Sequence, residues 1–211
     1  MIAHFVLAGA ALAASAALVP TTGSAQTAGG DTWQFRCPAA GTVVEQSTGA
    51  ELKYRGEAAN NPGSCMLQNG QRRLLGYWQV SEGFYRAGGK EIAARVAGPG
   101  VNAAGTQPVT FDYFTNNRTN ESIHVQESWR VAGSGPLTVP AGTFNTVRVE
   151  RQFRILGSAF AYTQTVWFDR ATGAPVSARV EHLNAVQAPT LVNWVANDVI
   201  VPAAARTAAA R

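Results

Sequence analysis

Apolar and polar residues alternate along the second half of the chain with a period of two, which is the spacing of a half-buried β-strand. In residues 123–131, Ile, Val and Trp occupy every second position except 127, and polar residues fill the places between. The alternation returns in residues 147–155 and, after a Leu-Gly-Ser turn, in residues 160–168. We therefore predict one strand followed by a hairpin of two more.

The segment Asp169–Pro175 is rich in turn-forming residues, and a further alternating stretch follows it, so the hairpin extends to a three-strand meander. The first half is less regular, and its short candidate strands cover residues 33–36, 41–44, 52–55, 72–80 and 109–113. Only residues 90–97 suit a helix, which the flanking glycines should keep short. The pattern predicts a mostly β fold: a single antiparallel curved sheet or half-barrel with at most one or two short helices.

The ends of the chain differ from the alternating part. Residues 2–19 are almost entirely apolar and small residues precede a cut after Ala25, so residues 1–25 are predicted to be a cleaved signal peptide. No Lys or Arg precedes the apolar run, and an uncleaved membrane anchor is the alternative. The remaining segments are interpreted as a flexible lead-in over residues 26–30, a single β-rich domain over 31–201 and a flexible Ala/Arg tail over 202–211.

The chain contains two cysteines, Cys37 and Cys65. Export would place them in an oxidising compartment, where a disulfide between them is expected. Their spacing matches neither a zinc-binding pattern nor a CxxC redox motif, so a reactive thiol or a metal-binding pair is the less favoured alternative. The sequence therefore predicts a disulfide-closed protein of the periplasm or the cell exterior, with no stable membrane span after cleavage.

Charge is dispersed along the chain. The 17 Lys and Arg residues exceed the 13 Asp and Glu residues by four, which gives a formal net charge of +4. No run of five or more basic residues occurs, whereas binding to nucleic acid or to an anionic membrane normally uses clustered positive charge. We therefore expect no nucleic-acid partner.

The usual motifs of nucleophilic and phosphate-binding sites are absent from the sequence. Residues 133–136 do not have the spacing of a nucleophile elbow, and the glycine-containing string at residues 83–91 does not match a phosphate loop. A metal site built from His124, His182 and a carboxylate is the alternative to two solvent-facing histidines, which we favour. We expect no metal and no cofactor.

Glu127 breaks the apolar face of its predicted strand, and Arg151 breaks that of the next. We favour a buried ion pair between them, or a bulge, over a cavity carboxylate that acts as a general acid. Tryptophans at such positions are mostly core residues, but Trp167 lies on the opposite face of its strand and would line a second apolar surface needing a helix or a ligand to cover it. The candidate ligand-binding residues are Glu127, Trp129, Arg151 and Trp167.

Two segments, Pro140-Ala141-Gly142-Thr143-Phe144-Asn145-Thr146 and the stretch from Trp167 to Val176, resemble bacterial periplasmic β-rich proteins of unknown function. In those families a P-A-G-T-F-[DN]-T turn opens a long strand and a W-F-D-x-x-T-G-x-P-V hairpin follows it. The families are distantly similar to the half-barrels of the lipoprotein carriers LolA and LolB, whose concave face holds acyl chains. The resemblance implies a curved sheet and an apolar or lipid-like ligand.

Two kinds of function fit these patterns. The first is an exported, non-catalytic protein that binds an apolar or lipid-like ligand in its curved sheet. The second is an envelope protein that contacts other proteins without a small ligand. An enzyme of unrecognised type, with Glu127 and His124 as its candidate groups, is a third alternative. A roomy apolar cavity would favour the first, an exposed apolar patch the second and a polar cleft the third.

Overall fold

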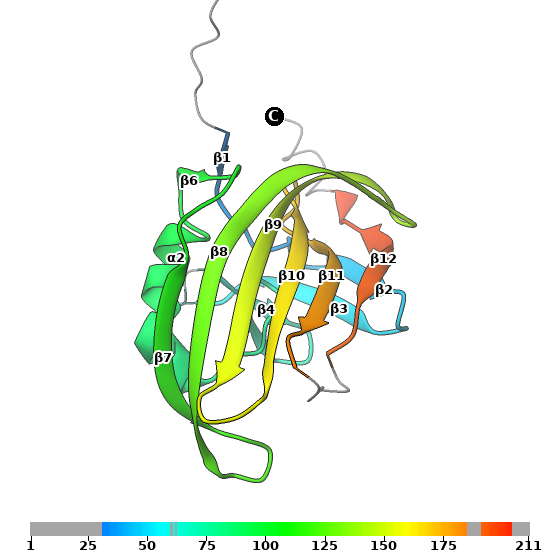
Figure 1. The fold of residues 1–211 in the computed structure, drawn as a ribbon. Helices are drawn as coiled ribbons and strands as arrows, with labels where there is room; N and C mark the ends of the chain where they lie inside the picture. Colours follow the sequence, from blue (N-terminus) through cyan, green and yellow to red (C-terminus); the bar gives the residue numbers. More distant parts are fainter. Residues whose placement is uncertain (1–30, 60, 62, 185–190, 204–211) are drawn as a thin grey trace, which may run out of the picture.

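The computed structural model describes residues 31–59, 61, 63–184 and 191–203. One ten-stranded antiparallel sheet curves around the core, with the strand order β5-β4-β3-β2-β12-β11-β10-β9-β8-β7 (Figure 1), and a short separate sheet pairs β1 with β6. The strands are β1 Thr32–Trp33, β2 Val43–Gln46, β3 Glu51–Glu57, β4 Ser64–Leu67, β5 Arg72–Leu74, β6 Val101–Asn102, β7 Val109–Asn116, β8 Ser122–Val139, β9 Gly142–Ile155, β10 Ala161–Asp169, β11 Pro175–His182 and β12 Trp194–Ile200. The prediction of a mostly β fold with a curved antiparallel sheet is confirmed.

The meander predicted in the second half is present. Strands β8, β9, β10 and β11 pair antiparallel with their sequence neighbours, and β8 and β9 are joined by the tight turn at Pro140-Ala141. Strand β8 is the longest and bends over the top of the sheet in Figure 1. Its register with β9 shifts between Val131 and Gly133. This bulge lets the strand curve without losing its pairing on either side.

Two strands of the sheet are absent from the sequence-based prediction. Strand β4 is short and carries Cys65, and β12 is interrupted by Asn197 and Asp198, so neither shows a regular alternation. Strand β12 nevertheless joins the two halves of the sheet, because it pairs with β11 on one side and with β2 on the other. A junction of this kind depends on residues far apart in the chain.

The helical segment is longer than predicted and begins earlier. It consists of α1 Glu82–Phe84, the π-helical turn η1 Tyr85–Gly89 and α2 Lys90–Arg95. The helix predicted over 90–97 is present as α2, which begins at Lys90 as predicted and ends at Arg95, whereas the preceding Gly88 and Gly89 continue the helical segment as part of η1. A Cβ at Gly88 would stand 2.3 Å from the ring of Phe111 on β7, so the glycine permits close packing of helix and strand.

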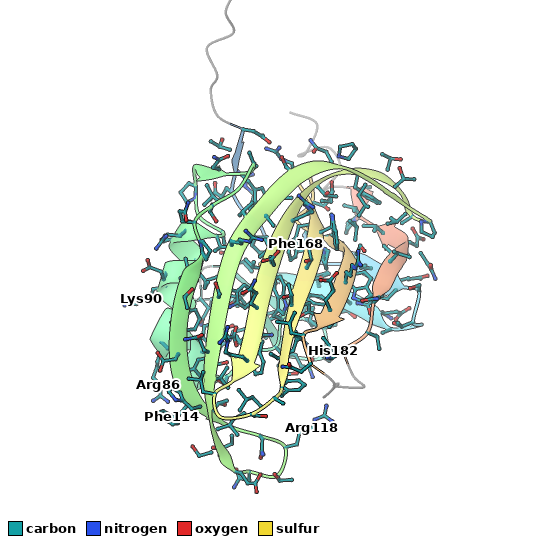
Figure 2. The ribbon with its side chains drawn as sticks, viewed as in Figure 1. Arg86, Lys90, Phe114, Arg118, Phe168 and His182 are labelled. Carbon is teal, nitrogen blue, oxygen red and sulfur yellow. A yellow bond between two sulfur atoms is a disulfide. The ribbon has the colours of Figure 1, made fainter. Side chains whose placement is uncertain are left out.

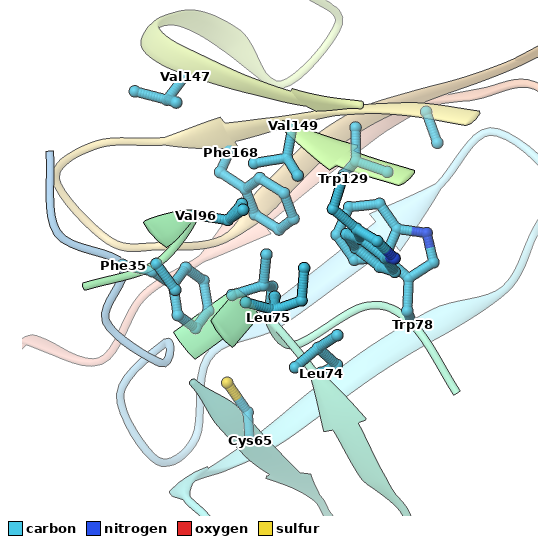
Figure 3. Close-up of a cluster of buried hydrophobic side chains, with 14 of the residues drawn as sticks. Phe35, Cys65, Leu74, Leu75, Trp78, Val96, Trp129, Val147, Val149 and Phe168 are labelled. Carbon is cyan, nitrogen blue, oxygen red and sulfur yellow. The ribbon is translucent and has the colours of Figure 1, made fainter. Parts of the chain in front are cut away.

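The concave side of the sheet is filled by large side chains. Trp78 packs edge-on against Trp129 with their ring centroids 4.8 Å apart, and Phe168 stands 5.7 Å from Trp78. Leu74 and Leu75 complete this layer, in which Figure 3 shows the side chains interleaved between the sheet and the chain that covers it. The expectation that the tryptophans are mostly core residues is confirmed for Trp33, Trp78, Trp129 and Trp194.

Cys37 and Cys65 form the predicted disulfide, with their Sγ atoms 2.06 Å apart. It fastens the segment after β1 to β4, at the buried side of the small strands. A disulfide is compatible with an oxidising, exported location. Within the described ranges no helix is both long and apolar enough to cross a membrane. The predicted signal peptide at 1–25, the lead-in at 26–30 and residues 204–211 of the predicted tail lie outside the described residues.

Removing this disulfide should destabilise the protein measurably. The two cysteines are 28 residues apart, and closing a loop of that length restricts the unfolded chain by roughly 3 to 4 kcal/mol. The variant Cys37→Ala/Cys65→Ala should therefore lose about that free energy of unfolding in urea titrations. Reducing the wild-type protein with dithiothreitol should give a similar loss. A change below about 1 kcal/mol in both experiments would contradict the prediction.

Candidate functional site

A buried polar cluster lies on the concave face of the sheet, where β7, β8 and β9 are adjacent. The Glu127 carboxylate has no solvent exposure and accepts four hydrogen bonds. Tyr113 Oη donates at 2.7 Å and Trp129 Nε1 donates at 2.7 Å. Arg151 binds with both arms of its guanidinium group, from Nε at 2.9 Å and from the terminal nitrogen at 2.6 Å. The favoured prediction of a buried Glu127–Arg151 pair is confirmed.

The strand register explains why these side chains meet. Arg151 stands opposite Trp129 across the β8–β9 pairing, and Glu127 lies two residues before Trp129 on the same face. Tyr113 reaches the carboxylate from β7, beyond Phe111, which is the direct partner of Glu127. Each of these residues therefore occupies an inward-facing position of its strand, where the alternating pattern would otherwise have an apolar residue.

Electrostatics within the cluster favour a charged pair surrounded by neutral groups. Burial by itself would lower the pKa of Arg151, but the negative charge of Glu127 outweighs it and the pKa is raised. Burial, together with the Glu127 charge, raises the pKa of the Tyr113 hydroxyl, which stays a neutral donor. The guanidinium also lies 5.4 Å from the ring centroid of Trp129 and 5.1 Å from that of Phe153.

This geometry assigns Glu127 a structural part. Its two oxygens already accept four hydrogen bonds, and the side chain does not reach solvent. A general acid or base must contact its substrate, so the buried carboxylate lacks the access that acid catalysis needs. Trp129 is equally buried, and Arg151 is 7% exposed.

A second buried polar group was missed by the sequence analysis. Trp78 Nε1 donates to Gln164 Oε1 at 2.6 Å, and Trp194 Nε1 donates to the Tyr77 hydroxyl at 3.0 Å. Gln164 also approaches Tyr77, from its Nε2 at 3.3 Å. The available signal was Gln164 itself, which breaks the apolar face of β10 as Glu127 breaks that of β8. These bonds attach the chain after β5 to the middle of the sheet.

Half-buried rings gather on the concave face at the end of the sheet near the β9–β10 turn. We call Phe153, Phe160, Tyr162 and His182 the aromatic cluster. Phe153 stacks on Tyr162 with centroids 5.1 Å apart, Phe160 contacts both, and His182 lies 6.3 Å from Tyr162. Tyr162 is buried and the other three are partly exposed. Figure 2 shows His182 toward the lower end of the sheet, well below Phe168.

His182 contains an unusual polar atom. Its Nδ1 is buried, and within the described part of the chain it has no hydrogen-bond partner. An unpaired buried polar atom costs about 1 to 3 kcal/mol, which a bound group with a matching donor or acceptor would recover. The atom stands beside the aromatic rings of the cluster rather than beside Glu127.

A groove of about 370 Å³ opens at the same end of the sheet. Phe153 and Ile155 line it together with the β9–β10 turn, although their side chains point to the concave face, where the aromatic cluster lies. Its polar lining comes from alternate residues of β8 and β9, which point to the outer face of the sheet. These polar residues are Gln126, Ser128, Gln152 and Arg154. The volume falls within the roughly 300–1,000 Å³ usual for small-molecule sites.

The structure brings together three of the four predicted binding residues. Glu127, Trp129 and Arg151 form the buried cluster, whereas Trp167 lies on the outer face, between Arg148 on β9 and Ser177 on β11. Trp167 is half-buried, and its neighbours on that face are largely polar.

The two histidines lie apart, in different surroundings. His124 contacts Asp112 at 2.6 Å on the outer face and stacks on Phe114, whereas His182 belongs to the aromatic cluster. Among the described residues, no three His, Cys, Asp or Glu side chains come together as metal ligands. The two histidines therefore do not share a site.

The fold and the site define a class of protein: a disulfide-closed, curved antiparallel sheet with a filled concave side, a buried ion pair and an aromatic cluster at one end. Comparison of the chain with protein-family models, with curated proteins and with solved structures finds no match.

Proposed function

We propose that this is an exported, non-catalytic protein that binds an apolar or lipid-like ligand at the open end of its curved sheet. The aromatic cluster is the observation that carries the proposal. Its rings are in mutual contact, and three of them are partly exposed at the end of the concave face. Partly exposed aromatic residues that meet in a concave surface are typical of sites for apolar molecules.

The position of the cluster limits how a ligand would bind. The middle of the concave face is occupied by Trp78, Trp129 and Phe168, so the ligand would lie across the end of the sheet. The buried Glu127–Arg151 pair lies directly behind Phe153 and Tyr162, with the Arg151 guanidinium 5.1 and 5.9 Å from their ring centroids. The pair therefore fixes the rings in place and does not itself need to contact the ligand.

An exported location and a relationship to periplasmic half-barrels belong to the same proposal. The Cys37–Cys65 disulfide and the curved antiparallel sheet support both. The periplasm is the compartment in which we expect the mature chain, after cleavage near Ala25. Carriers of apolar molecules are useful there because such molecules must cross an aqueous layer between membranes.

Titration with a fluorescent fatty acid tests the binding proposal. The wild-type protein should bind the probe in a one-to-one complex, and Phe153→Ala should weaken binding about tenfold because it removes apolar contact area. Native mass spectrometry of protein purified from its own host should show a co-purified apolar molecule. A wild-type protein that carries none and takes up no fatty acid would overturn the proposal.

Two further variants control this experiment. Phe160→Ala should weaken binding in the same direction, and it removes a ring from the turn before β10 rather than from a strand. Phe114→Ala removes an equally large ring from the exposed side of β7 (Figure 2) and should leave binding unchanged. Thermal melts followed by circular dichroism confirm that each variant is folded at the temperature of the binding measurement.

A contact surface for another envelope protein is the second candidate function. It rests on Phe114, which is 67% exposed on the edge strand β7 and stacks on His124 with centroids 4.4 Å apart. An exposed aromatic on an edge strand is a common point of protein contact. This function would be favoured if the wild-type protein binds no fatty acid and captures a partner protein that the Phe114→Ala variant does not capture.

A further inference from the structure

The groove belongs to a larger surface on the outer face of the sheet, opposite the aromatic cluster. One row of outward side chains crosses the sheet from β7 to the end of β11, because the strand register sets each residue beside the next. The row consists of Asp112, Gln126, Arg154, Ala161 and Leu183, whose amide donates to the Ala161 carbonyl at 2.9 Å. Five strands about 4.8 Å apart span roughly 19 Å, which is the length of about six residues of an extended peptide.

Exposed apolar side chains stand at both ends of this row. Leu183 is 57% exposed at one end, and Phe114, two residues from Asp112 on the same face of β7, is 67% exposed at the other (Figure 2). Leu156 lines the groove, and its amide donates to the carbonyl of His124, the residue opposite Phe114. We call the row, together with Phe114 and Leu156, the outer patch. Exposed aromatic and arginine side chains in one surface are typical of protein interfaces.

Arg154 gives the outer patch a positive charge without a counter-ion. Three outward carboxylates of β7, β9 and β11 are each bound to a basic side chain, at 2.6, 2.9 and 3.2 Å: Asp112 to His124, Glu150 to Arg130 and Glu181 to Arg179. Arg154 is exposed and forms no ion pair with any residue of the described ranges. Arg148, also outward on β9, donates to the Ala132 carbonyl at 2.9 Å. The guanidinium of Arg154 therefore complements a carboxylate from outside the chain.

The neutral polar groups beside Arg154 suit a peptide backbone. Ser128 and Gln152 stand opposite each other in the next row, and both line the groove together with Gln126. The Ser128 hydroxyl accepts a hydrogen bond from Thr110 at 3.0 Å and can still donate its own proton. The side-chain amide of Gln126 can both donate and accept. Such groups match the N–H and C=O groups of an extended chain, whereas a nucleic acid would need several clustered cations.

We propose that the outer patch binds an extended segment of another protein in which a carboxylate stands between apolar residues. The carboxylate lies beside Arg154, and the apolar side chains contact Phe114 and Leu183 at the two ends of the row. The outer patch is on the face opposite the aromatic cluster, so the inference goes beyond ligand binding and does not depend on it. It gives the second candidate function a partner of defined chemistry.

Selection of a phage-displayed library of random peptides on the wild-type protein tests this chemistry. The recovered peptides should carry Asp or Glu next to apolar residues. Synthesised with a fluorescent label, they should bind the protein in solution, and added salt should weaken the binding. Arg154→Glu should weaken it at least about tenfold, because it sets two negative charges against each other. Replacing the acidic residue of the peptide by Lys should restore binding to this variant.

Matched variants control for the position of each change. Arg55→Glu makes the same change of charge on β3, in the other half of the sheet, and should not affect peptide binding. Leu183→Ala should weaken peptide binding severalfold because it removes apolar contact area. Ile200→Ala removes a side chain that is 44% exposed on β12 and should have no effect. Thermal melts confirm that each variant is folded at the temperature of the binding measurement.

The inference is overturned if no peptide is enriched, if the recovered peptides lack acidic residues, or if they bind the wild-type protein and Arg154→Glu equally. Self-association of the wild-type protein that Arg154→Glu abolishes, seen by sedimentation velocity without peptide binding, would assign the outer patch to a second copy of the chain. Binding to phosphatidylglycerol vesicles that the same variant loses, again without peptide binding, would assign it to a membrane surface. Either result overturns the acidic partner, and none of them affects the fatty-acid binding measured on the concave face.

Discussion

The substitution Arg151→Met should lower the free energy of unfolding by about 3 to 5 kcal/mol, because it leaves the Glu127 carboxylate buried without its counter-ion. Methionine is flexible and unbranched like the aliphatic part of arginine, although shorter, so part of the loss reflects volume and the double variant below isolates the charge. Tyr113 and Trp129 would still donate to the carboxylate but carry no charge. Urea unfolding followed by tryptophan fluorescence measures the difference.

A double variant isolates the charge. Glu127→Gln/Arg151→Met removes both charges and keeps an acceptor for Tyr113, so it should recover most of the stability that the single variant loses. A single variant as stable as the wild type would show that the pair contributes little to the fold.

The substitution Gly173→Ala should cost at least about 3 kcal/mol, which combines a backbone conformation unfavourable to alanine with a steric clash. Gly173 has a φ of +71° in the turn between β10 and β11, where its amide donates to the Asp169 carbonyl at 2.8 Å. An added Cβ would stand 1.8 Å from the carbonyl oxygen of Arg36, in the segment after β1. One of the two backbones would have to move.

Gly49→Ala is the matched control. Gly49 has a φ of +81° in the β2–β3 turn, and no atom lies within 4 Å of an added Cβ. The free energy of unfolding of this variant should therefore fall by only the conformational cost of alanine at positive φ, about 1 to 2 kcal/mol. Thermal melts of the two variants give the difference, which measures the contact between the turn and Arg36. Equal losses of stability in the two variants would mean that the turn and Arg36 can move apart with no cost in free energy.

The sequence by itself determined the features that depend on neighbours along the chain. Alternation with a period of two located most of β8, β9 and β10, because successive side chains of a strand point to opposite faces. The turn at Pro140–Gly142 and the turn at Asp169–Pro175 followed from residues that favour turns. The Glu127–Arg151 pair could also be predicted, since two charges that break adjacent apolar faces leave each other as the obvious partner.

Only the tertiary structure decided what depends on contacts between distant segments. Strand β12 is held by β2 and β11, and its own sequence alternates too weakly to identify it. Gly88 stays within a helix because the Phe111 ring packs against it, a contact that outweighs the low helix propensity of glycine. The aromatic cluster needs the pairing of β9, β10 and β11, which brings Phe153, Tyr162 and His182 together. Local patterns fix which way each side chain points, whereas register between strands fixes which side chains meet.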